Sequence, residues 1–576
     1  MADPSDTPDT IDIEDLRSLD DDPLILDTRE DAPVLVPALP PTTFVRIARK
    51  LRDEDRLDLL LPHATPYQLS SLLDVDGWVR DRVDIRRARV WLHAIAKYAT
   101  ADRERGALAD LMYAMDPELW TVALAAGTVV VLIDAEDDQA RDDAMSQLGS
   151  LRTWETPDGF FVVGVPDDEL GRRTLHTISL LYEDDLAEGR KLCMSIQSLL
   201  PAEAEETLLR FRDGRLADLG FVEWEQAMQL LRPLDHRTAA KHEALDFAHL
   251  GSIEGLEPMV KWRGSDLLRQ VMMRLSPGDH GLRSREFLLL AAEMMSAQRF
   301  DPGDEKAQER SIDQTQATLA LGLELLAREA PSGMKVDVFL AERVQAIGLR
   351  LVFRVGYGAL HKVRQAAQLL VRSGRVSLRS PGSLLDRPWG PAIAALSGLF
   401  PELPRRDGKG SRPMARLSDV VVATDLVAQA GALARLCFEP DGYGVDPAWL
   451  DHLDAPEKVT LGDLVRTAIV HTHLPGSVHA FAPLTAEDLS WAAANLLQGQ
   501  ELAPSVGREL AERCADLGIG EHQQALAETI LLRLRVELAS LERDVDGTIE
   551  LSRAGGVVTI GSVSMWLSLR HGEPSN

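Results

Sequence analysis

The 576-residue chain has little cysteine, and the few cysteines lie far apart. Cys193, Cys437 and Cys514 form neither the close ligand spacing of a zinc site nor a disulfide framework. Such usage is typical of a reducing compartment. The N-terminus is acidic and lacks the basic and apolar segments of a signal peptide. We therefore expect a cytoplasmic protein.

The sequence also lacks the signatures of common enzymes. It has no GxGxxG after a predicted strand, no GxxxxGK followed by Ser or Thr, no HExxH and no GxSxG. These patterns hold dinucleotides, phosphates, catalytic zinc and nucleophilic serines. The sequence thus predicts no cofactor and no metal. It favours a non-catalytic role and leaves an enzyme of unrecognised type as a third reading.

Long apolar runs and excess positive charge are missing as well. The longest uncharged apolar run, residues 119–133, has 15 residues, fewer than the roughly 20 that cross a bilayer. We expect no membrane insertion. The 62 Lys and Arg residues face 91 Asp and Glu, a net charge of −29. This balance argues against nucleic-acid binding by the molecule as a whole, because phosphate contacts need a positive surface.

The sequence contains many amphipathic helical patterns separated by loops rich in proline and glycine. They predict a mainly α protein of stacked helix pairs, similar to an α-solenoid, with a small α+β insert and a C-terminal hairpin. The predicted parts are a disordered acidic tail with a proline-rich linker (1–41), a helix-pair domain (42–127), a strand-containing insert (128–179), a central helical domain (180–372), a loop-rich linker (373–415), a C-terminal helical domain (416–545) and a terminal hairpin and tail (546–576).

One segment, LLPAEAEETLLRFRDGRLADLGFVEWEQAMQLLRPLD (199–235), carries a resemblance to a known family. Its helical spacing predicts packed helices with a break at Gly214 and with Trp224 buried at their centre. An arginine-rich helix end, the GRLADLGF turn and the closing Pro233-Leu234-Asp235 resemble a family of uncharacterised bacterial proteins, mainly deltaproteobacterial, known only as a domain of unknown function. The resemblance implies no activity.

A second stretch, KLRDEDRLDLLLPHATPYQLSSLLDVDGW (50–78), is similar in style to the cytosolic helical domain of a magnesium-transporter family. It alternates helices that end in Leu-Pro with Leu-Leu-Asp steps. This likeness implies helix pairs at the N-terminal end of the folded chain.

The first candidate site is the arginine cluster of the 199–235 segment. Arg210, Arg212 and Arg215 could form a multi-donor anion or partner site, oriented by nearby acids such as Asp218. The alternative is structural: arginines at a helix end offset the negative end of the helix dipole and hold neighbouring helices together. Alternating charges favour this second interpretation.

The second candidate is a cationic stripe. Arg343, Arg350, Arg354 and Arg364 recur at helical spacing, and residues 343–379 contain eight Lys and Arg with no Asp or Glu. Such a stripe could bind nucleic acid, an anionic partner or the acidic tail. Arg405, Arg406, Lys409, Arg412 and Arg416 would enlarge it if they lie close in space. Alternatively, its arginines pair with acids elsewhere.

These observations favour a cytoplasmic scaffold or adaptor that binds another protein through an extended helical surface. The alternative is an anion- or nucleic-acid-binding regulatory module that uses the stripe between Arg343 and Arg379. Nucleic acid is the less favoured partner because the rest of this acidic chain would repel phosphate.

Overall fold

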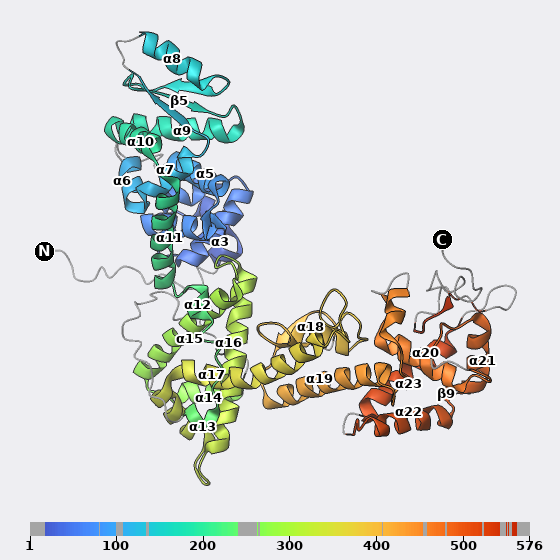
Figure 1. Cartoon of the computed structure of the whole chain (residues 1–576). Coiled ribbons are helices and arrows are strands. Elements are labelled where there is room, and N and C mark those ends of the chain that lie inside the picture. Colours follow the sequence, from blue (N-terminus) through green and yellow to red (C-terminus); the bar gives the residue numbers. More distant parts are fainter. Residues whose placement is uncertain are drawn as a thin grey trace, which may run out of the picture.

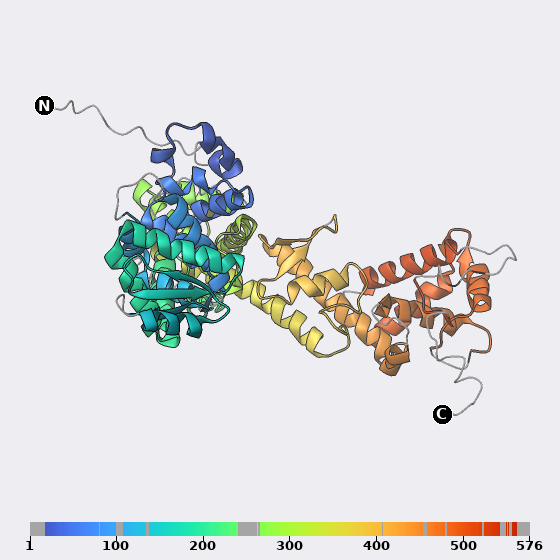
Figure 2. The same ribbon diagram turned by 90° about the horizontal axis from the view of Figure 1, so that it is seen from above.

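The structure, a computed structural model, describes residues 18–79, 81–99, 107–133, 138–239, 262, 265–405, 407–452, 458–477, 481–520, 523–541, 549, 551 and 556–560. They form a mainly helical molecule with a few small sheets, which confirms the predicted fold class. Figure 1 shows a column of N-terminal and central helices, from which an arm leads to a C-terminal lobe. From above, the arm and the lobe extend far to one side of the column (Figure 2). The described chain is thus L-shaped.

Short helices build the N-terminal part of the column. They are η1 (Pro23–Thr28), α2 (Ala32–Leu35), α3 (Pro41–Asp53), η2 (Leu57–Leu59), η3 (Leu61–His63), α4 (Pro66–Asp76), α5 (Ile85–Ala94), η4 (Ile95–Ala99), α6 (Ala107–Met115) and α7 (Pro117–Ala125), with the hairpin of β1 (Trp78–Val79) and β2 (Arg82–Val83) after α4. α3 packs on α4, which begins with a capping box of Thr65 and Gln68. Phe44, Trp91 and Trp120 lie in their common core.

The predicted tail and linker, residues 1–41, are folded from residue 18 onward, so that part of the prediction is wrong. Leu19 and Leu26 are buried in the N-terminal core, and the Asp20 carboxylate pairs with Arg46 of α3 at 2.5 Å. The high number of acidic residues suggested disorder. The segment nevertheless docks, because its leucines are buried and its acid Asp20 pairs with an arginine of α3. Residues 1–17 lie outside the described part of the chain.

We expect Asp20→Ala to lower the free energy of unfolding by about 1–2 kcal/mol, since it removes a charged hydrogen bond from a largely buried arginine. The Arg46 and Asp20 side chains are 8% and 15% exposed. Urea denaturation followed by circular dichroism measures the change. Asp21→Ala is the matched control, because Asp21 is exposed. Equal loss in both variants would contradict the docking contact.

The strand-containing insert is confirmed at the top of the column in Figure 1. β3 (Val129–Leu132), β4 (Arg152–Glu155) and β5 (Phe161–Val165) form an antiparallel sheet in the order β3-β5-β4, with α8 (Asp138–Leu148) between β3 and β4. The β4–β5 hairpin turns at Pro157-Asp158-Gly159. β5 is buried along its whole length because α8 and α9 (Glu169–Asp184) both pack against it.

The 199–235 segment departs from its prediction in two ways. After α10 (Leu186–Ser198), helix α11 (Pro201–Asp218) runs unbroken through Gly214, and the chain turns instead at Gly220, where φ is +86°. α12 (Trp224–Ala227) is a single turn that packs on α15. Trp224 is 42% exposed, so it is not the buried centre of the packing. Helical spacing groups residues on a face but does not say which face is covered.

Trp224→Ala should therefore cost about 1–2 kcal/mol of unfolding free energy rather than the larger loss of a core tryptophan. The indole Nε1 donates to the Ala297 carbonyl at 3.2 Å, and the Arg299 guanidinium lies 4.7 Å from the ring centre. Thermal and urea unfolding measure the loss. Trp91→Ala, which empties a fully buried site, is the comparison and should cost more. Equal losses would contradict the half-exposed position.

The central domain completes the column. Its helices are α13 (His236–Ala239), α14 (Asp266–Arg274), α15 (Pro277–Gln298), α16 (Glu305–Leu326), η6 (Ala327–Glu329) and α17 (Val336–Arg372). α16 packs between α15 and α17. α17 leaves the column and begins the arm (Figure 1).

The arm and lobe contain α18 (Trp389–Leu396), β6 (Glu402–Pro404), β7 (Ser411–Pro413), α19 (Leu417–Phe438), η7 (Pro447–His452), α20 (Leu461–His473), α21 (Ala486–Leu496), β8 (Leu497–Gln498), β9 (Glu501–Leu502), α22 (Pro504–Asp516) and α23 (Gln523–Ala539). The predicted linker at 373–415 is wrong. Val376, Trp389 and Leu403 belong to one hydrophobic core that continues from the central domain into the lobe. Several prolines and glycines of this segment belong to the packed β6–β7 hairpin and helix α18 and do not mark a linker between domains.

The predicted terminal hairpin, 546–576, lies mostly outside the described residues. Near its middle, Thr559 forms a parallel bridge with Leu484. The Leu484 N–H donates to the Val558 carbonyl at 2.9 Å, and Val557 and Val558 are buried. This short segment therefore pairs with the lobe.

Candidate partner-binding surface

The arginine cluster of α11 is a joint between helices. The Arg215 guanidinium makes two hydrogen bonds to the Asp74 carboxylate of α4, at 2.7 and 2.8 Å, and an ion pair with Asp116 at 2.7 Å. Arg212 Nε donates to the Asp74 carbonyl at 2.9 Å. Burial raises the pKa of Asp74, against the opposing effect of Arg215. These contacts fix α11 to α4 and α7, the structural role that the sequence favoured.

The other two residues of that cluster, Arg210 and Asp218, are exposed to solvent. The cluster therefore does not converge on one open anion site. Asp74, its central acid, was missed because it stands 141 residues before Arg215 in the chain.

The cationic stripe is not one open surface either. Arg350 Nη1 pairs with Glu293 of α15 at 2.6 Å, and the Arg350 side chain is 16% exposed. Arg354 Nε donates to the Arg232 carbonyl at 3.0 Å. Arg364 reaches the Tyr357 hydroxyl at 3.5 Å, and Arg343 lies over the Phe339 ring. α17 carries all four arginines, but most of their guanidinium groups are engaged within the chain.

A break in α17 explains why the helical spacing of the four arginines did not predict one continuous cationic surface. Gly348 has φ +75° and ψ 167°, so the helix before it is out of phase with the helix after it. Two buried residues of α15 satisfy the backbone groups freed there. Glu286 Oε1 accepts from the Arg350 N–H at 2.8 Å, and Arg283 Nη2 donates to the Gln345 carbonyl at 3.0 Å. Arg283 and Glu286 also pair with each other at 2.7 Å.

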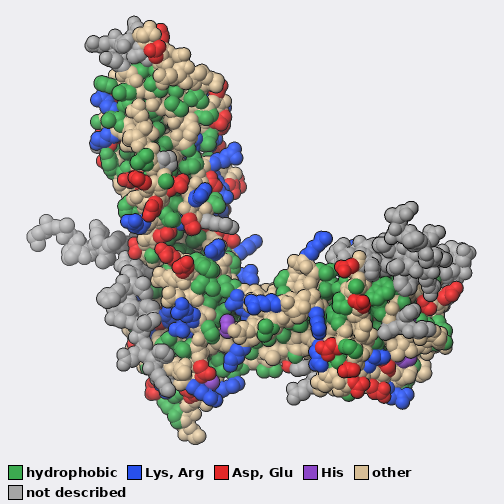
Figure 3. Space-filling view, in the orientation of Figure 1, with side chains coloured by type: hydrophobic (Ala, Val, Ile, Leu, Met, Phe, Trp, Pro, Cys, Tyr) green, Lys and Arg blue, Asp and Glu red, His purple; other side chains and the backbone are tan. Residues whose placement is uncertain are grey.

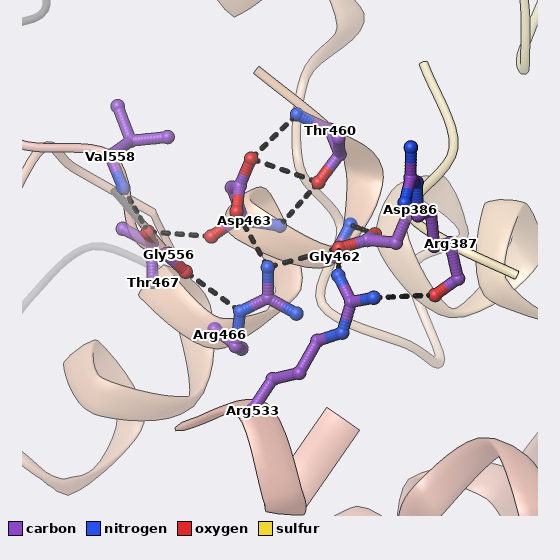
Figure 4. Close-up of polar contacts among 10 residues, drawn as sticks. All are labelled: Asp386, Arg387, Thr460, Gly462, Asp463, Arg466, Thr467, Arg533, Gly556 and Val558. Carbon is purple, nitrogen blue, oxygen red and sulfur yellow. Dashed lines mark hydrogen bonds and ion pairs between the residues drawn. The ribbon is translucent and has the colours of Figure 1, made fainter. Parts of the chain in front are cut away.

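A buried ionic network fixes the arm to the lobe (Figure 4). Asp386, just before α18, accepts three hydrogen bonds: from the Gly462 N–H at 2.8 Å, from Arg466 Nη2 at 3.1 Å and from Arg533 Nη1 at 2.9 Å. Arg466 also pairs with Asp463 at 2.5 Å and donates to the Gly556 carbonyl at 2.7 Å.

The chemistry of this network is structural. The Asp386 and Arg466 side chains are 1% and 3% exposed, so a substrate has no access to them. Burial raises the pKa of Asp463, while Arg466 acts in the opposite direction. α20 contributes Gly462 and Arg466 and α23 contributes Arg533, and so three separate chain segments, including that of Asp386 itself, meet at one carboxylate. This cluster could not be predicted from the sequence, because Arg466 and Arg533 are 80 and 147 residues away from Asp386.

Positive charge remains exposed along the arm. Residues 343–416 contain fourteen Lys and Arg and three Asp and Glu in a chain of net charge −29. Arg372, Arg379 and Lys409 are exposed to solvent. Arg387 and Arg405 line a pocket of about 540 Å³ between α18 and the β6–β7 hairpin, floored by Pro388, Pro391 and Ala394. The sequence had suggested that Arg405 and Lys409 could enlarge the cationic stripe.

A groove with largely apolar walls lies between α17 and α19 in the arm. Its volume is about 570 Å³. One wall is a face of α17 (Val355, Gly358, Ala359, Val363 and Ala366), the other is a face of α19 (Leu417, Val420, Val421, Thr424 and Val427), and residues 233–236 with Leu325 and Arg328 close the rest. Figure 3 shows hydrophobic side chains along α19 with Lys and Arg beside them.

Local contacts shape this groove. Leu234 crosses α17, its N–H donating to the Arg354 carbonyl at 3.1 Å. A Cβ on Gly358 would lie 3.0 Å from the Leu234 carbonyl oxygen, so glycine permits this close crossing. α19 is the one described helix long and apolar enough to cross a membrane by length and composition, which is weak evidence by itself. Less than half of that apolar stretch, 44%, is buried in the fold.

Among the described residues, no group of three or more His, Cys, Asp or Glu is placed to hold a metal ion. Val421 and Val422 of α19 are 59% and 50% exposed, and these are the residues that the sequence reasoning missed. The signal was the run of three valines at 420–422, which places apolar side chains around more than one face of a helix.

Comparison with known proteins places the chain in a family without assigning an activity. No curated protein and no solved structure matches it. A family model does match, over residues 22–548, which is nearly the whole chain, and this agrees with the resemblance found in the 199–235 segment. The chain belongs to a family of unknown function, DUF6178.

Proposed function

We propose that this protein is a cytoplasmic, non-catalytic scaffold that binds another protein through its arm. The observation that carries the proposal is the apolar surface of α19, which is left open on the groove side. Val421, which lines the groove, is 59% exposed, and an apolar side chain left this open in a groove offers a surface for association. The buried Asp386 network and the continuous core support the arm as a firm platform.

The test is affinity capture with the full chain from native lysate. We expect wild type to retain a partner in near-stoichiometric amount, and we expect Val421→Asp to lose most of it, because the charge is placed on exposed apolar surface. Val422→Asp, the adjacent position on the same helix outside the groove lining, controls for general effects of an added acid. Absence of any retained protein with wild type would overturn the scaffold role.

The second candidate is an anion-binding module, favoured by the exposed cations of the arm and by the Arg387–Arg405 pocket. Reversal of Arg350 is a poor test, since it would break the Glu293 ion pair. Arg387→Glu with Arg405→Glu is the better variant. A mixed-sequence oligonucleotide should bind wild type measurably at about 50 mM salt and lose affinity steeply as salt rises, if this candidate holds. We expect no such binding, because the rest of the chain repels phosphate.

A further inference from the structure

We infer that the α17–α19 groove binds an acidic amphipathic helix of a partner protein. This inference rests on the proposed scaffold function and names its binding site and the chemistry of its partner. Two helices whose apolar stripes meet along one open groove leave a position for a third helix, which is a common mode of helix recognition.

The lining residues form one helical face on each side of the groove. On α17 the floor residues Val355, Ala359 and Val363 follow one another at four-residue steps, and Val355 and Val363 are only 1% and 3% exposed. On α19 Val420, Thr424 and Val427 follow one another at steps of four and three. Gly358, Ala359 and Ala366 are small, so a third backbone can approach α17 closely.

Charge decides between possible occupants. The charged residues that line the groove are Arg328, Lys362 and a single acid, Asp235, with His236 beside it. The pKa of Asp235 lies below its ordinary value chiefly because the Arg237 N–H donates to it, with the positive charge of Lys362 also acting. Both Arg328 and Lys362 are exposed and carry no ion pair in the described part of the chain.

A second copy of this chain seated groove to groove would bring these cations against their own kind, which disfavours a symmetric dimer at this surface. A neutral lipid or other neutral apolar ligand leaves both cations unused. An amphipathic helix with acids beside its apolar face would cover the exposed Val421 and pair with both cations.

The experiment measures binding of labelled synthetic peptides to the full chain by fluorescence anisotropy. The probe is an 18-residue peptide with leucines at i, i+3 and i+7 spacing and glutamates at the positions that flank the leucine face. One control has lysines in place of the glutamates, and a second has the same composition in scrambled order. We expect the acidic amphipathic peptide to bind at least about tenfold more tightly than either control.

Variants locate the site. Val421→Asp should weaken binding of the acidic peptide about tenfold or more, and Val422→Asp less than about twofold, because only Val421 lines the groove. Arg328→Glu with Lys362→Glu should weaken binding of the acidic peptide and strengthen binding of the lysine peptide, most clearly at about 50 mM salt.

Three results would overturn the inference: equal binding of the scrambled peptide, equal loss in both valine variants, or a homodimer in sedimentation that Val421→Asp dissolves. A partner retained equally by wild type and Val421→Asp in affinity capture would overturn the groove as the site and leave the scaffold role standing. Failure of wild type to retain any protein overturns the scaffold role itself.

Discussion

Replacing Asp386 with alanine is expected to lower the free energy of unfolding by about 3–5 kcal/mol, one of the two largest effects foreseen for this chain. The carboxylate is the acceptor for the Gly462 N–H and for the guanidinium groups of Arg466 and Arg533. Without the Asp386 carboxylate, the Arg466 side chain stays buried at 3% exposure and keeps only one carboxylate partner, Asp463. A buried charge that loses a partner has no water to replace it.

Urea denaturation followed by circular dichroism measures this loss. The matched control is Glu501→Ala, which removes an ion pair with Arg535. Arg535 lies on α23, the helix that also carries Arg533. The Glu501 side chain is 74% exposed, so its loss should cost less than about 1 kcal/mol. Similar losses in the two variants would show that the Asp386 network contributes no more than a surface pair.

The second large effect is expected for Gly348→Ala, at about 2–4 kcal/mol of destabilisation. Its φ of +75° is unfavourable for an L-residue with a side chain. A Cβ there would also lie 2.9 Å from Glu286 Oε1, the atom that accepts the Arg350 N–H. The alanine would therefore strain the backbone and displace Glu286 from its buried pair with Arg283.

Gly281→Ala provides a control of opposite sign. Gly281 lies inside α15, and a Cβ there would meet no atom within 4 Å. Alanine should raise stability by about 0.5–1 kcal/mol, because it lowers the conformational entropy lost on folding. A comparison of urea midpoints separates the two cases. If Gly348→Ala also stabilised the protein, the break in α17 would not have the geometry described.

The candidate surface could be predicted only in part. The concentration of positive charge between 343 and 416 is visible in the sequence, and the arm does carry exposed cations. Which cations are available depends on partners from distant segments: Glu293 engages Arg350, and Asp74 engages Arg215. Linear spacing also assumes an unbroken helix, and Gly348 removes that condition within α17.

Sequence by itself determined the local features of this protein. The helical periodicity, the strand-containing insert and the family segment could all be predicted, because each depends on residues close along the chain. The tertiary structure alone decided which faces are covered. Packing buried Leu19 and Leu26, joined the expected linker to a continuous core and left Val421 exposed. Burial is a property of segments that meet in space, and no local pattern records which segments those are.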